Sequence, residues 1–479
     1  MKSTTAKQKN NHKTNQNYLF PPEIWRKRNL LYYQDIERFY RFYVNSNSKV
    51  LEVGSGTGYL LASVNPEYGL GIDINEQAIE YARYRFPDLD FILEDGEHYN
   101  SNQKFDYILF ANTVSYLHDL HKTFSNLASC CHPNTRLILT FHNPAWEIIL
   151  RLATLLKQRT PIDNLNWLSY EDIRNILNLN GFEVICHHKQ MLLPRRIFGL
   201  SWLLNKIIAP LPLINQLCLT ESIIARPKIN QTDTVKQHQT LTCSVIIPAR
   251  NEAGNIESCV TRMPPLGKHT EIIFIEGHSK DNTWEEIQRV QAKYGHQWDI
   301  KICQQTGKGK GDAVRQGFAM ATGDILMILD SDLTVRPEDL THFFDALASG
   351  ACEFANGCRL VYPVHPQAMP WLNRMANRFF AWLLSYLLGI KIKDSLCGTK
   401  VLFRHHYQQI AENRSYFGDF DPFGDFDLLF GAAKLGLQMK DVPVRYDPRT
   451  YGSSNIQHFK EGIVLLKMCL FAAKKIKFR

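Results

Sequence analysis

Two aspartates two residues apart, Asp330 and Asp332, directly follow an apolar run from Ile325 to Leu329. Carboxylates with this spacing at the end of a strand can both face one hard cation, and a divalent metal, Mg²⁺ or Mn²⁺, is the natural bridge to a diphosphate. An isolated Asp-x-Asp pattern is common in proteins. Its meaning therefore depends on the residues that the fold brings beside it.

Three further segments of the C-terminal half are candidates for such neighbours. One apolar run ends in a proline and a polar turn at Pro248–Glu252, and the next ends at the acidic Glu276. Farther along, alternating glycines and lysines from Gly307 to Gly311 offer cations and free backbone amides to a pyrophosphate. Together with the Asp330 segment, these elements are expected to meet at one crevice of the sheet.

These four segments together resemble the inverting family-2 glycosyltransferases of the GT-A fold, especially the dolichyl- or polyprenyl-phosphate mannosyltransferase-like branch, over about residues 241–460. The resemblance implies that Pro248 and Glu252 contact the nucleoside of a nucleotide sugar and that Glu276 contacts its base or ribose. It also implies that Asp330 and Asp332 hold the metal and the diphosphate. A Glu-Gly-His-Ser run begins at Glu276 where many members have Asp-Asp-Gly-Ser, so a UDP- or a GDP-linked donor remains open.

The same resemblance places two later segments near the sugar acceptor. Lys400 lies in the first and Arg449 in the second, and both are implied to hold an acceptor phosphate or the leaving phosphate. Asp425 or Asp427 would be the catalytic base that deprotonates a hydroxyl acceptor such as a glycan. A lipid phosphate is already anionic at neutral pH and needs no strong base, so both acceptor classes remain open.

The N-terminal half contains a second candidate site, for a nucleoside cofactor. An apolar run from Val50 to Val53 leads straight into three alternating glycines, Gly54, Gly56 and Gly58. Glycines let the backbone approach a ligand closely, and the helix that follows offers free amides. About 20 residues farther on, Asp73 ends the next apolar run, where a carboxylate can accept hydrogen bonds from both ribose hydroxyls.

This pattern resembles the class I S-adenosylmethionine-dependent methyltransferases over about residues 20–225. By that resemblance Glu52 and the three glycines hold the methionine part of the cofactor, Asp73 the ribose and Asp95 the adenine edge. A dehydrogenase would use a Gly-x-Gly-x-x-Gly fingerprint, and here the third glycine comes one residue early. Methyl transfer therefore fits better than hydride transfer.

The methyl acceptor is left open by the sequence. By the same resemblance, residues at the end of the strand Phe105–Phe110 would face the methyl group. The Asn/Asp-Pro-Pro-Tyr type of tetrapeptide is missing there, which argues against an amino group of a nucleobase. His98, His118 and His142 lie near predicted strand ends and are either general bases for an oxygen acceptor or ordinary surface and packing histidines.

Short strand-like runs alternate with helical patterns on both sides of a polar stretch, which predicts two separate doubly wound α/β sheets. The fold class is therefore α/β, with a Rossmann-like methyltransferase sheet followed by a GT-A nucleotide-diphospho-sugar transferase sheet. We expect a disordered polar tail (1–20), a methyltransferase domain (21–226), a linker (227–241) and a glycosyltransferase domain (242–479). The expected strands are Lys49–Val53, Tyr68–Asp73, Asp90–Leu93, Phe105–Phe110 and Arg136–Phe141, then Cys243–Ala249, Glu271–Glu276, Ile300–Gln304, Asp324–Leu329 and Glu353–Asn356.

Composition narrows the partners and the compartment. The net charge of +8 comes without the long Lys/Arg tracts of nucleic-acid-binding proteins, so no nucleic-acid partner is expected. Eleven scattered cysteines and a polar N-terminus without an apolar signal core indicate a cytoplasmic protein. Two apolar stretches, Ile197–Ala225 and Phe379–Ile390, are shorter than a membrane span or interrupted. Each is expected to be a core helix or an interfacial helix of a protein peripheral to the cytoplasmic membrane face.

The sequence thus predicts a bifunctional enzyme. One half transfers a sugar, with metal dependence and inversion, from a nucleotide sugar to a lipid-phosphate or glycan acceptor. The other half methylates an associated sugar, lipid or glycan. The alternative is a methyltransferase for a lipid, a quinone or another small molecule, joined to an accessory or non-catalytic glycosyltransferase-like module.

Overall fold

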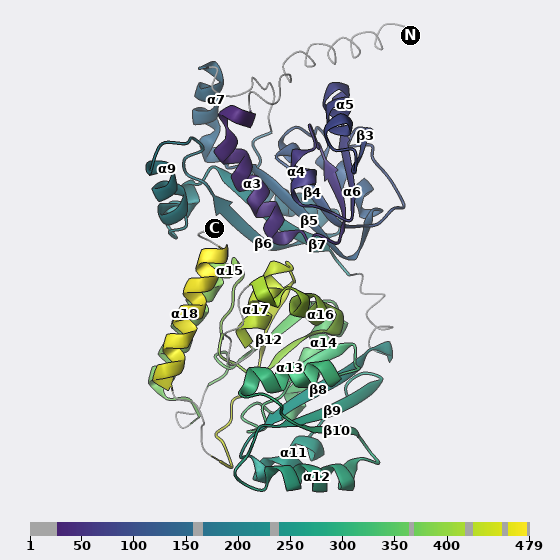
Figure 1. The fold of residues 1–479 in the computed structure, drawn as a ribbon, viewed down its shortest axis with the longest axis vertical. Coiled ribbons are helices and arrows are strands. Elements are labelled where there is room, and N and C mark those ends of the chain that lie inside the picture. Colours follow the sequence, from purple (N-terminus) through teal and green to yellow (C-terminus); the bar gives the residue numbers. More distant parts are fainter. Residues whose placement is uncertain are drawn as a thin grey trace. The chain divides into compact units, whose positions relative to one another are not determined.

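The computed structural model of the chain describes residues 26–156, 166–229, 239–363, 368–416, 425–452 and 458–476. Two compact units make up the chain, Met1–Lys228 and Ile229–Arg479 (Figure 1). The expected tail, residues 1–20, and residues 230–238 of the expected linker lie outside the described residues. The last strand of the first unit ends at Pro227, and the first strand of the second begins at Thr242.

The N-terminal unit is built on a mixed sheet whose described part has seven strands in the order β3-β2-β1-β4-β5-β7-β6. Strands β1 to β5 are parallel, whereas β7 runs antiparallel to both β5 and β6. The order reverses between β1 and β4, and open α/β sheets bind ligands at the carboxyl edge of such a switch point. The strands are β1 (Lys49–Val53), β2 (Tyr68–Asp73), β3 (Asp90–Leu93), β4 (Phe105–Ala111), β5 (Cys131–His142), β6 (Phe182–Gln190) and β7 (Thr220–Pro227).

Helices cover both faces of this sheet. Side chains of α6 and α8, such as Phe124 and Leu177, pack in the core with one face of the central strands. On the other face α3 buries Tyr40, whose hydroxyl donates to the Phe110 carbonyl oxygen at 2.8 Å. The helices are α3 (Leu30–Tyr43), α4 (Tyr59–Ser63), α5 (Glu76–Arg85), α6 (Leu120–Ala128), α7 (Glu147–Leu155), α8 (Tyr170–Leu179) and α9 (Leu200–Trp202).

Polar capping residues explain where three of these helices begin. The side chain of Asn75 accepts from the Ala78 amide at the start of α5, and that of Asp119 accepts from the Lys122 amide at the start of α6. Ser169 forms a capping box at the start of α8. Each cap satisfies an amide that the first turn of a helix leaves without an intrahelical partner.

The five strands predicted in this half are present, although β5 begins at Cys131 rather than Arg136. The prediction of a helix over Ile197–Ala225 was wrong. The stretch holds α9, a π-helical turn (Leu203–Ile208), a 3₁₀ turn (Ile214–Leu217) and most of β7. Prolines within it interrupt helical hydrogen bonding, and its last residues complete the sheet between β5 and β6.

The C-terminal unit is also built on a mixed sheet, with seven strands in its described part in the order β10-β9-β8-β11-β13-β12-β14. The strands β10, β9, β8 and β11 are parallel, and the order reverses between β8 and β11. Strand β13 runs antiparallel to β11 and β12, whereas β14 runs parallel to β12; the predicted α/β fold class is confirmed in both units, with an antiparallel strand in each sheet. The strands are β8 (Thr242–Ala249), β9 (His269–Glu276), β10 (Asp299–Gln304), β11 (Ile325–Ile328), β12 (Phe354–Cys358), β13 (Lys400–Phe403) and β14 (Met439–Pro443).

Alternate residues of β8 explain the two helical layers of this unit. Val245 and Ile247 lie in a core shared with α11, α12 and α14, whereas Ile246 points to the opposite face and meets α13. A Cβ at Gly317 of α13 would lie 2.5 Å from Ile246 Cγ2, so glycine lets this helix approach the strand closely. The helices are α11 (Ile256–Thr261), α12 (Thr283–Tyr294), α13 (Lys310–Met320), α14 (Leu340–Ala348), α15 (Trp371–Leu388), α16 (Arg404–Glu412), α17 (Asp425–Lys434) and α18 (His458–Ile476).

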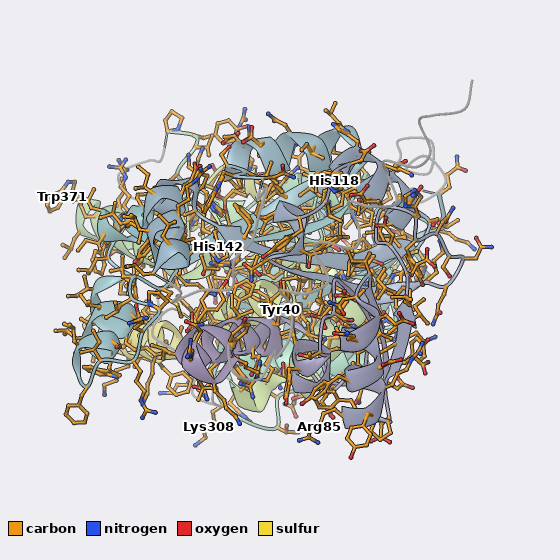
Figure 2. The ribbon with its side chains drawn as sticks, turned by 90° about the horizontal axis from the view of Figure 1, so that it is seen from above. Tyr40, Arg85, His118, His142, Lys308 and Trp371 are labelled. Carbon is orange, nitrogen blue, oxygen red and sulfur yellow. The ribbon has the colours of Figure 1, made fainter. Side chains whose placement is uncertain are left out.

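The apolar stretch Phe379–Ile390 forms most of α15, which packs beside α18 (Figure 1). Helix α15 buries one apolar side, including Phe380 and Leu384, and exposes another that includes Trp371 and Trp382. Figure 2 shows the Trp371 side chain at the edge of the picture, away from the ribbon. Among the described residues, no helix combines the length and the apolar character that crossing a bilayer requires.

Candidate active sites

A glycine-rich loop follows β1 and lies over the end of β2. Gly54, Gly56 and Gly58 have φ angles of 74°, 51° and 78°, in the left-handed region where a side chain causes strain. The backbone amides of Gly54 and Ser55 donate to the Ile72 carbonyl oxygen at 2.8 and 2.9 Å. The three glycines named from the sequence therefore lie together at the switch point of the first sheet.

The surface of this loop combines close packing with open space. A Cβ at Gly58 would lie 2.6 Å from the Phe91 ring, whereas a Cβ at Gly56 would meet no heavy atom within 4 Å. The buried hydroxyl of Ser55 has no hydrogen-bond partner within the described chain. Buried polar atoms are normally satisfied, so an exposed backbone beside an unused hydroxyl fits a polar cofactor that lies on the loop.

Two carboxylates beside the loop are held by backbone amides. Asp73 accepts from Gly56 N at 2.7 Å and from Asn75 N at 2.8 Å, and Glu52 accepts from Leu61 N at 3.0 Å. Burial raises the pKa of both carboxyls, and that of Glu52 lies well above its usual range. Because backbone amides hold both carboxyl groups, a ligand that offers hydroxyl or cationic groups would find acceptors already fixed in place.

Asp95, predicted to face the adenine, lies in the loop after β3. Its carboxylate accepts from Glu97 N at 2.9 Å and lies 3.1 Å from His98 Nδ1. The exposed His118 donates from its backbone amide to the Glu97 side chain. His98 thus pairs with a residue expected to bind the cofactor, and the general-base roles of His98 and His118 remain predictions.

His142, at the end of β5, has surroundings that suit the acceptor side of the site. The Tyr32 hydroxyl donates to Asn112 Oδ1 at 3.1 Å and lies 3.1 Å from His142 Nε2. The rings of Tyr32 and His142 stack with centroids 5.9 Å apart, and His142 is labelled in Figure 2. Since Asn112 directly follows β4, these polar groups lie at the carboxyl edge beside the switch point.

In the second unit, both residues of the Asp-x-Asp pair follow β11 and face cations. Asp330 Oδ1 lies 2.6 Å from Lys310 Nζ, and Asp332 Oδ2 lies 2.6 Å from an Arg449 guanidinium nitrogen. The other Asp332 oxygen accepts from the amide and hydroxyl of Thr334 at 3.1 and 2.8 Å. The predicted metal ligands are therefore rigidly placed and electrically compensated.

Arg449 joins the Asp-x-Asp pair to the turn after β8. Its Nη1 lies 3.1 Å from Glu252 Oε1, and Glu252 Oε2 accepts from Asn255 Nδ2 at 2.7 Å. Burial raises the pKa of Glu252 to about 6, although Asn255 and Arg449 act in the opposite direction. Two predicted residues from distant segments, Glu252 and Arg449, thus belong to the same cluster as Asp332.

The ends of β8, β9 and β11 are tied together by hydrogen bonds. Ser331 Oγ donates to the Pro248 carbonyl oxygen at 2.8 Å, and the Gly277 amide donates to the Ala249 carbonyl oxygen at 2.8 Å. The carboxylate of Glu276 accepts from Ser279 N at 2.5 Å. The residues assigned to the nucleoside, the base and the diphosphate therefore line one edge of the sheet.

The segment that holds Lys400 passes directly beside Asp330. A Cβ at Gly398 would overlap the Asp330 carboxylate, so only glycine allows this approach. Lys400 itself is fully buried, and its Nζ donates to the Cys397 carbonyl oxygen. Burial by itself would raise the pKa of Asp330, but the charges of Lys310 and Lys400, among others, hold it below its usual range.

A buried ion pair supports this segment and has no signal in the local sequence. Arg359 donates to both oxygens of Asp394, at 2.8 and 2.9 Å, and Asn377 of α15 donates to Asp394 Oδ1 at 2.7 Å. Burial acts to raise the pKa of Asp394, but the Arg359 charge lowers it to about 2. Helix α15 is thereby fastened to the loop that approaches Asp330.

The two predicted catalytic bases lie on α17. Asp425 is its first residue, and its side chain lies outside the described part of the structure. Asp427 Oδ2 lies 3.6 Å from Arg414 Nε, beside a small cavity lined by residues of α16, of α17 and of the segment after α16, including Gln409, Lys434 and Asn413. Asp427 thus faces a cation from the 3₁₀ turn Arg414–Tyr416 that follows α16, and its role as a base remains a prediction.

The donor set at Asp330 and Asp332 suits a hard cation, because carboxylate oxygens are the ligands that Mg²⁺ and Mn²⁺ prefer. Within the described residues, no three or more His, Cys, Asp or Glu side chains are grouped so that they could hold a metal ion without ligands from a substrate. Mg²⁺ is usually bound by one or two carboxylates together with phosphate oxygens of the substrate. The two aspartates therefore fit a metal that binds together with a diphosphate.

Comparison with protein families assigns the two units. Residues 24–187 match the model described as a methyltransferase domain, and residues 244–413 match the model described as glycosyl transferase family 2. The chain joins a methyltransferase domain to a family 2 glycosyltransferase domain. Each of the two α/β units thus matches one transferase domain model.

Curated relatives match the glycosyltransferase unit. The chain is 32% identical over 222 residues to a dolichol-phosphate mannosyltransferase of Pyrococcus furiosus, covering 45% of this chain and 59% of the relative. It is 26% identical over 222 residues to the low-salt glycan biosynthesis hexosyltransferase Agl6 of Haloferax volcanii, covering 46% of this chain and 51% of the relative. The chain thus spans between a half and two thirds of the length of these relatives.

Solved structures resemble each unit more distantly. The glucosyl-3-phosphoglycerate synthase of Mycobacterium tuberculosis, in complex with Mn²⁺, uridine diphosphate and its product, is 18% identical with a TM-score of 0.38, covering 52% of this chain and 85% of that chain. A possible histamine N-methyltransferase of Thermotoga maritima is 15% identical with a TM-score of 0.35, covering 44% and 98%.

Proposed function

We propose that the C-terminal unit transfers a sugar from a UDP- or GDP-linked donor to a lipid phosphate or glycan, with a divalent metal and inversion at the anomeric carbon. The observation that carries this proposal is the cluster of Asp330, Asp332, Lys310 and Arg449 at the carboxyl edge of the sheet. It brings two acidic metal ligands and two cations to one place. A nucleoside diphosphate needs both kinds of partner.

Each part of the donor has a proposed contact in this cluster. Pro248 and Glu252 would contact the nucleoside, Glu276 the base or ribose, and Asp330 the diphosphate through the metal. A cation held by Asp330 and Asp332 supplies neutralisation of charge on the leaving diphosphate. When the carboxylates turn to that cation, the ion pairs of Lys310 with Asp330 and of Arg449 with Asp332 are released, so these two cations can turn to phosphate oxygens, while Arg449 keeps its contact with Glu252.

A lipid phosphate is the acceptor class that we favour, with Lys400 and Arg449 as its proposed cationic contacts. Two of the relatives are named dolichol-phosphate mannosyltransferases, and a phosphate acceptor needs no strong base. Asp425 or Asp427 would be required only for a hydroxyl acceptor. The exposed aromatic side of α15, with Trp371 and Trp382, is proposed to rest on the membrane that carries the lipid.

We propose that the N-terminal unit methylates an associated sugar, lipid or glycan with S-adenosylmethionine. Glu52 and the glycines of the loop would hold the methionine part, Asp73 the ribose hydroxyls and Asp95 the adenine. The unused Ser55 hydroxyl and the open space at Gly56 support a ligand on the loop. The domain limits 21–226 and 242–479, with a linker over 227–241, belong to the same proposal.

The first experiment tests the sugar transfer. Full-length protein is incubated with Mn²⁺ or Mg²⁺, polyprenyl phosphate and a panel of UDP- and GDP-sugars, and lipid-linked sugar is quantified. Asp332→Ala should lose transfer, because it removes a metal ligand and the partner of Arg449. The matched control is Asp299→Ala, which removes an exposed carboxylate paired with His269 at the start of β10.

Transfer that survives in Asp332→Ala, or that persists without metal, would contradict the proposed role of the Asp-x-Asp pair. Donor turnover without transfer to lipid would redirect the search to glycan hydroxyls. In that case Asp425→Asn and Asp427→Asn become the decisive variants, since only a hydroxyl acceptor needs a base.

A further inference from the structure

The N-terminal unit has an exposed apolar face that its core does not explain. It is formed by α7 and by residues 197–217, and we call it the lipid face. Its members are large apolar side chains that are more than 40% exposed: Ile148, Ile149, Leu152, Leu155, Leu156, Ile197, Phe198, Leu200, Trp202, Leu203, Ile207, Leu211, Leu213 and Leu217. A contiguous apolar surface of this kind marks an interaction site rather than ordinary surface variation.

The two segments of the lipid face are joined to each other. Trp146 Nε1, just before α7, donates to the Leu217 carbonyl oxygen at 2.7 Å, and Asn143 Nδ2 donates to the Gln216 carbonyl oxygen at 3.0 Å. A small cluster of Leu150, Met191 and Leu219 packs between them. Figure 1 shows α7 and α9 on the same side of this unit.

Basic side chains outnumber acidic ones around the lipid face. Residues 191–220 contain Arg195, Arg196 and Lys206 and no aspartate or glutamate. On α7 the single acidic residue, Glu147, lies 2.5 Å from Arg151 in an ion pair. A protruding apolar surface with an aromatic anchor and a cationic surround suits the interface of an anionic bilayer, where apolar side chains enter the membrane and cations meet the headgroups.

The lipid face adjoins the edge of the sheet where the cofactor is expected. Its two segments follow the carboxyl ends of β5 and β6, and β5 ends at His142. Tyr32, which contacts His142, also packs against the cluster formed by Leu150, Met191 and Leu219. An acceptor held in a membrane under this face would therefore lie close to the polar cluster formed by Tyr32, Asn112 and His142.

We propose that the lipid face docks the methyltransferase unit on an anionic bilayer and that the methyl acceptor is carried in that bilayer. The second half of this statement rests on the proposed methyltransferase function. The transfer forms a bond from the acceptor oxygen or nitrogen to the methyl carbon and breaks the methyl–sulfonium bond. It leaves S-adenosylhomocysteine and releases the acceptor proton to solvent.

Trp202, which is 62% exposed on α9, provides a direct probe of docking. Full-length protein is mixed with vesicles of brominated phosphatidylcholine, with and without phosphatidylglycerol. The bromine on the acyl chains quenches the fluorescence of a tryptophan that enters the bilayer. The contribution of Trp202 is the difference between the wild type and Trp202→Phe. We expect vesicles with phosphatidylglycerol to quench the Trp202 fluorescence. In the double variant Phe198→Glu/Leu213→Glu this quenching should be lost.

The double variant replaces side chains that are 103% and 88% exposed, so the fold should tolerate it, and unchanged binding of S-adenosylmethionine checks this. Trp371→Glu/Leu372→Glu on α15 is the matched control for the other unit. It should leave the Trp202 signal quenched. Unquenched Trp202 on protein that still floats with vesicles would overturn the proposal, as would a concentration-dependent dimer that Phe198→Glu/Leu213→Glu abolishes.

The acceptor is tested with radiolabelled methyl groups on S-adenosylmethionine and vesicles that contain polyprenyl phosphate together with the donor sugar. Label in the lipid extract supports the inference, and its loss in Phe198→Glu/Leu213→Glu links it to the lipid face. Label confined to water-soluble products would overturn the lipid-borne acceptor. Absence of label from both phases with Trp202 still quenched would support docking and contradict the proposed methyltransferase activity instead.

Discussion

The two units both place carboxylates at the carboxyl edge of an α/β sheet but compensate their charge in different ways. In the N-terminal unit Glu52 and Asp73 accept hydrogen bonds from backbone amides. In the C-terminal unit Asp330 and Asp332 face the cations Lys310 and Arg449 at 2.6 Å. Glu52 and Asp73 lie at the carboxyl ends of β1 and β2, and Asp330 and Asp332 follow β11; β1 and β11 each border the reversal of strand order in their sheet.

This difference matches the charge of the ligand that each unit is proposed to bind. A cationic cofactor with ribose hydroxyls can join Glu52 and Asp73 without displacing any side chain. A metal and a diphosphate must instead divide the ion pairs of the second site between them, the metal taking the aspartates and the phosphates taking the cations. The first site is therefore preformed, and the second exchanges partners on binding.

Metal removal should produce the largest difference between the two sites. With a chelator present, we expect the affinity of the full-length protein for UDP or GDP to fall about a thousandfold, or about 4 kcal/mol, because Lys310 and Arg449 then stay paired with the two aspartates and the diphosphate loses both the metal and these cations. Affinity for S-adenosylmethionine should be unchanged, since Glu52 and Asp73 are held by amides. Isothermal titration calorimetry measures both, and an equal loss at the two sites would contradict the distinction.

The preformed character of the first site depends on Gly58. Its φ is 78° and a Cβ would lie 2.6 Å from the Phe91 ring, so Gly58→Ala combines backbone strain with overpacking and should cost about 3 kcal/mol of unfolding free energy. Gly181→Ala is the control, because Gly181 has a φ of 81° but no atom within 4 Å of a Cβ. It should cost about 1 kcal/mol in the same urea titration.

An equal cost for the two glycine variants would show that backbone strain alone sets the loss and that the contact with Phe91 is unimportant. A larger cost at Gly58, together with weaker binding of S-adenosylmethionine, would support a loop whose shape is fixed before the cofactor arrives.

Glu252 gives the second site a pH dependence of defined sign. Burial raises its pKa from 4.5 to about 6, so the folded state binds more protons than the unfolded state between these values. Stability is therefore highest below pH 4.5 for this group and falls as the pH rises through about 6, by about 2 kcal/mol in total. Glu252→Gln should remove that fall, as measured by denaturation at a series of pH values.

A wild type and a Glu252→Gln variant whose stabilities change in parallel across this range would contradict the raised pKa. His269→Gln serves as the control, because His269 pairs with the exposed Asp299 and lies at the opposite end of β9 from Glu276.

The outline of both sites could be predicted from the sequence because their signals are local. Gly54, Gly56 and Gly58 directly follow a buried strand, and Asp330 and Asp332 follow another. Strand positions followed from apolar runs bounded by polar turns. The same reasoning failed for Thr220–Pro227, because a buried strand and a buried helix have similar composition over a short run.

The ion pairs and hydrogen bonds that join the residues of each site could not be predicted, because the two partners of each pair come from distant parts of the chain. Arg449 lies 117 residues from Asp332 and 197 from Glu252, and Tyr32 lies 110 residues from His142. The buried pair of Arg359 and Asp394 is separated by 35 residues. No local pattern marks such pairs, since only the sheet order brings them together.

The smallest predicted effect concerns the hydrogen bonds of Asp73. Asp73→Asn keeps one carbonyl oxygen as an acceptor but loses the second and the charge, so one of the amides of Gly56 and Asn75 or a ribose hydroxyl is left unsatisfied. We expect the affinity for S-adenosylmethionine to fall about tenfold, or about 1.4 kcal/mol. Asp106→Asn is the matched control. Asp106 lies near the start of β4, at the edge of the sheet opposite the proposed cofactor site, and its carboxylate accepts a hydrogen bond from Lys49 N at 2.8 Å. It should leave cofactor affinity unchanged, and an equal loss in both variants would mean that Asp73 acts through the stability of the unit and not through contact with the ribose.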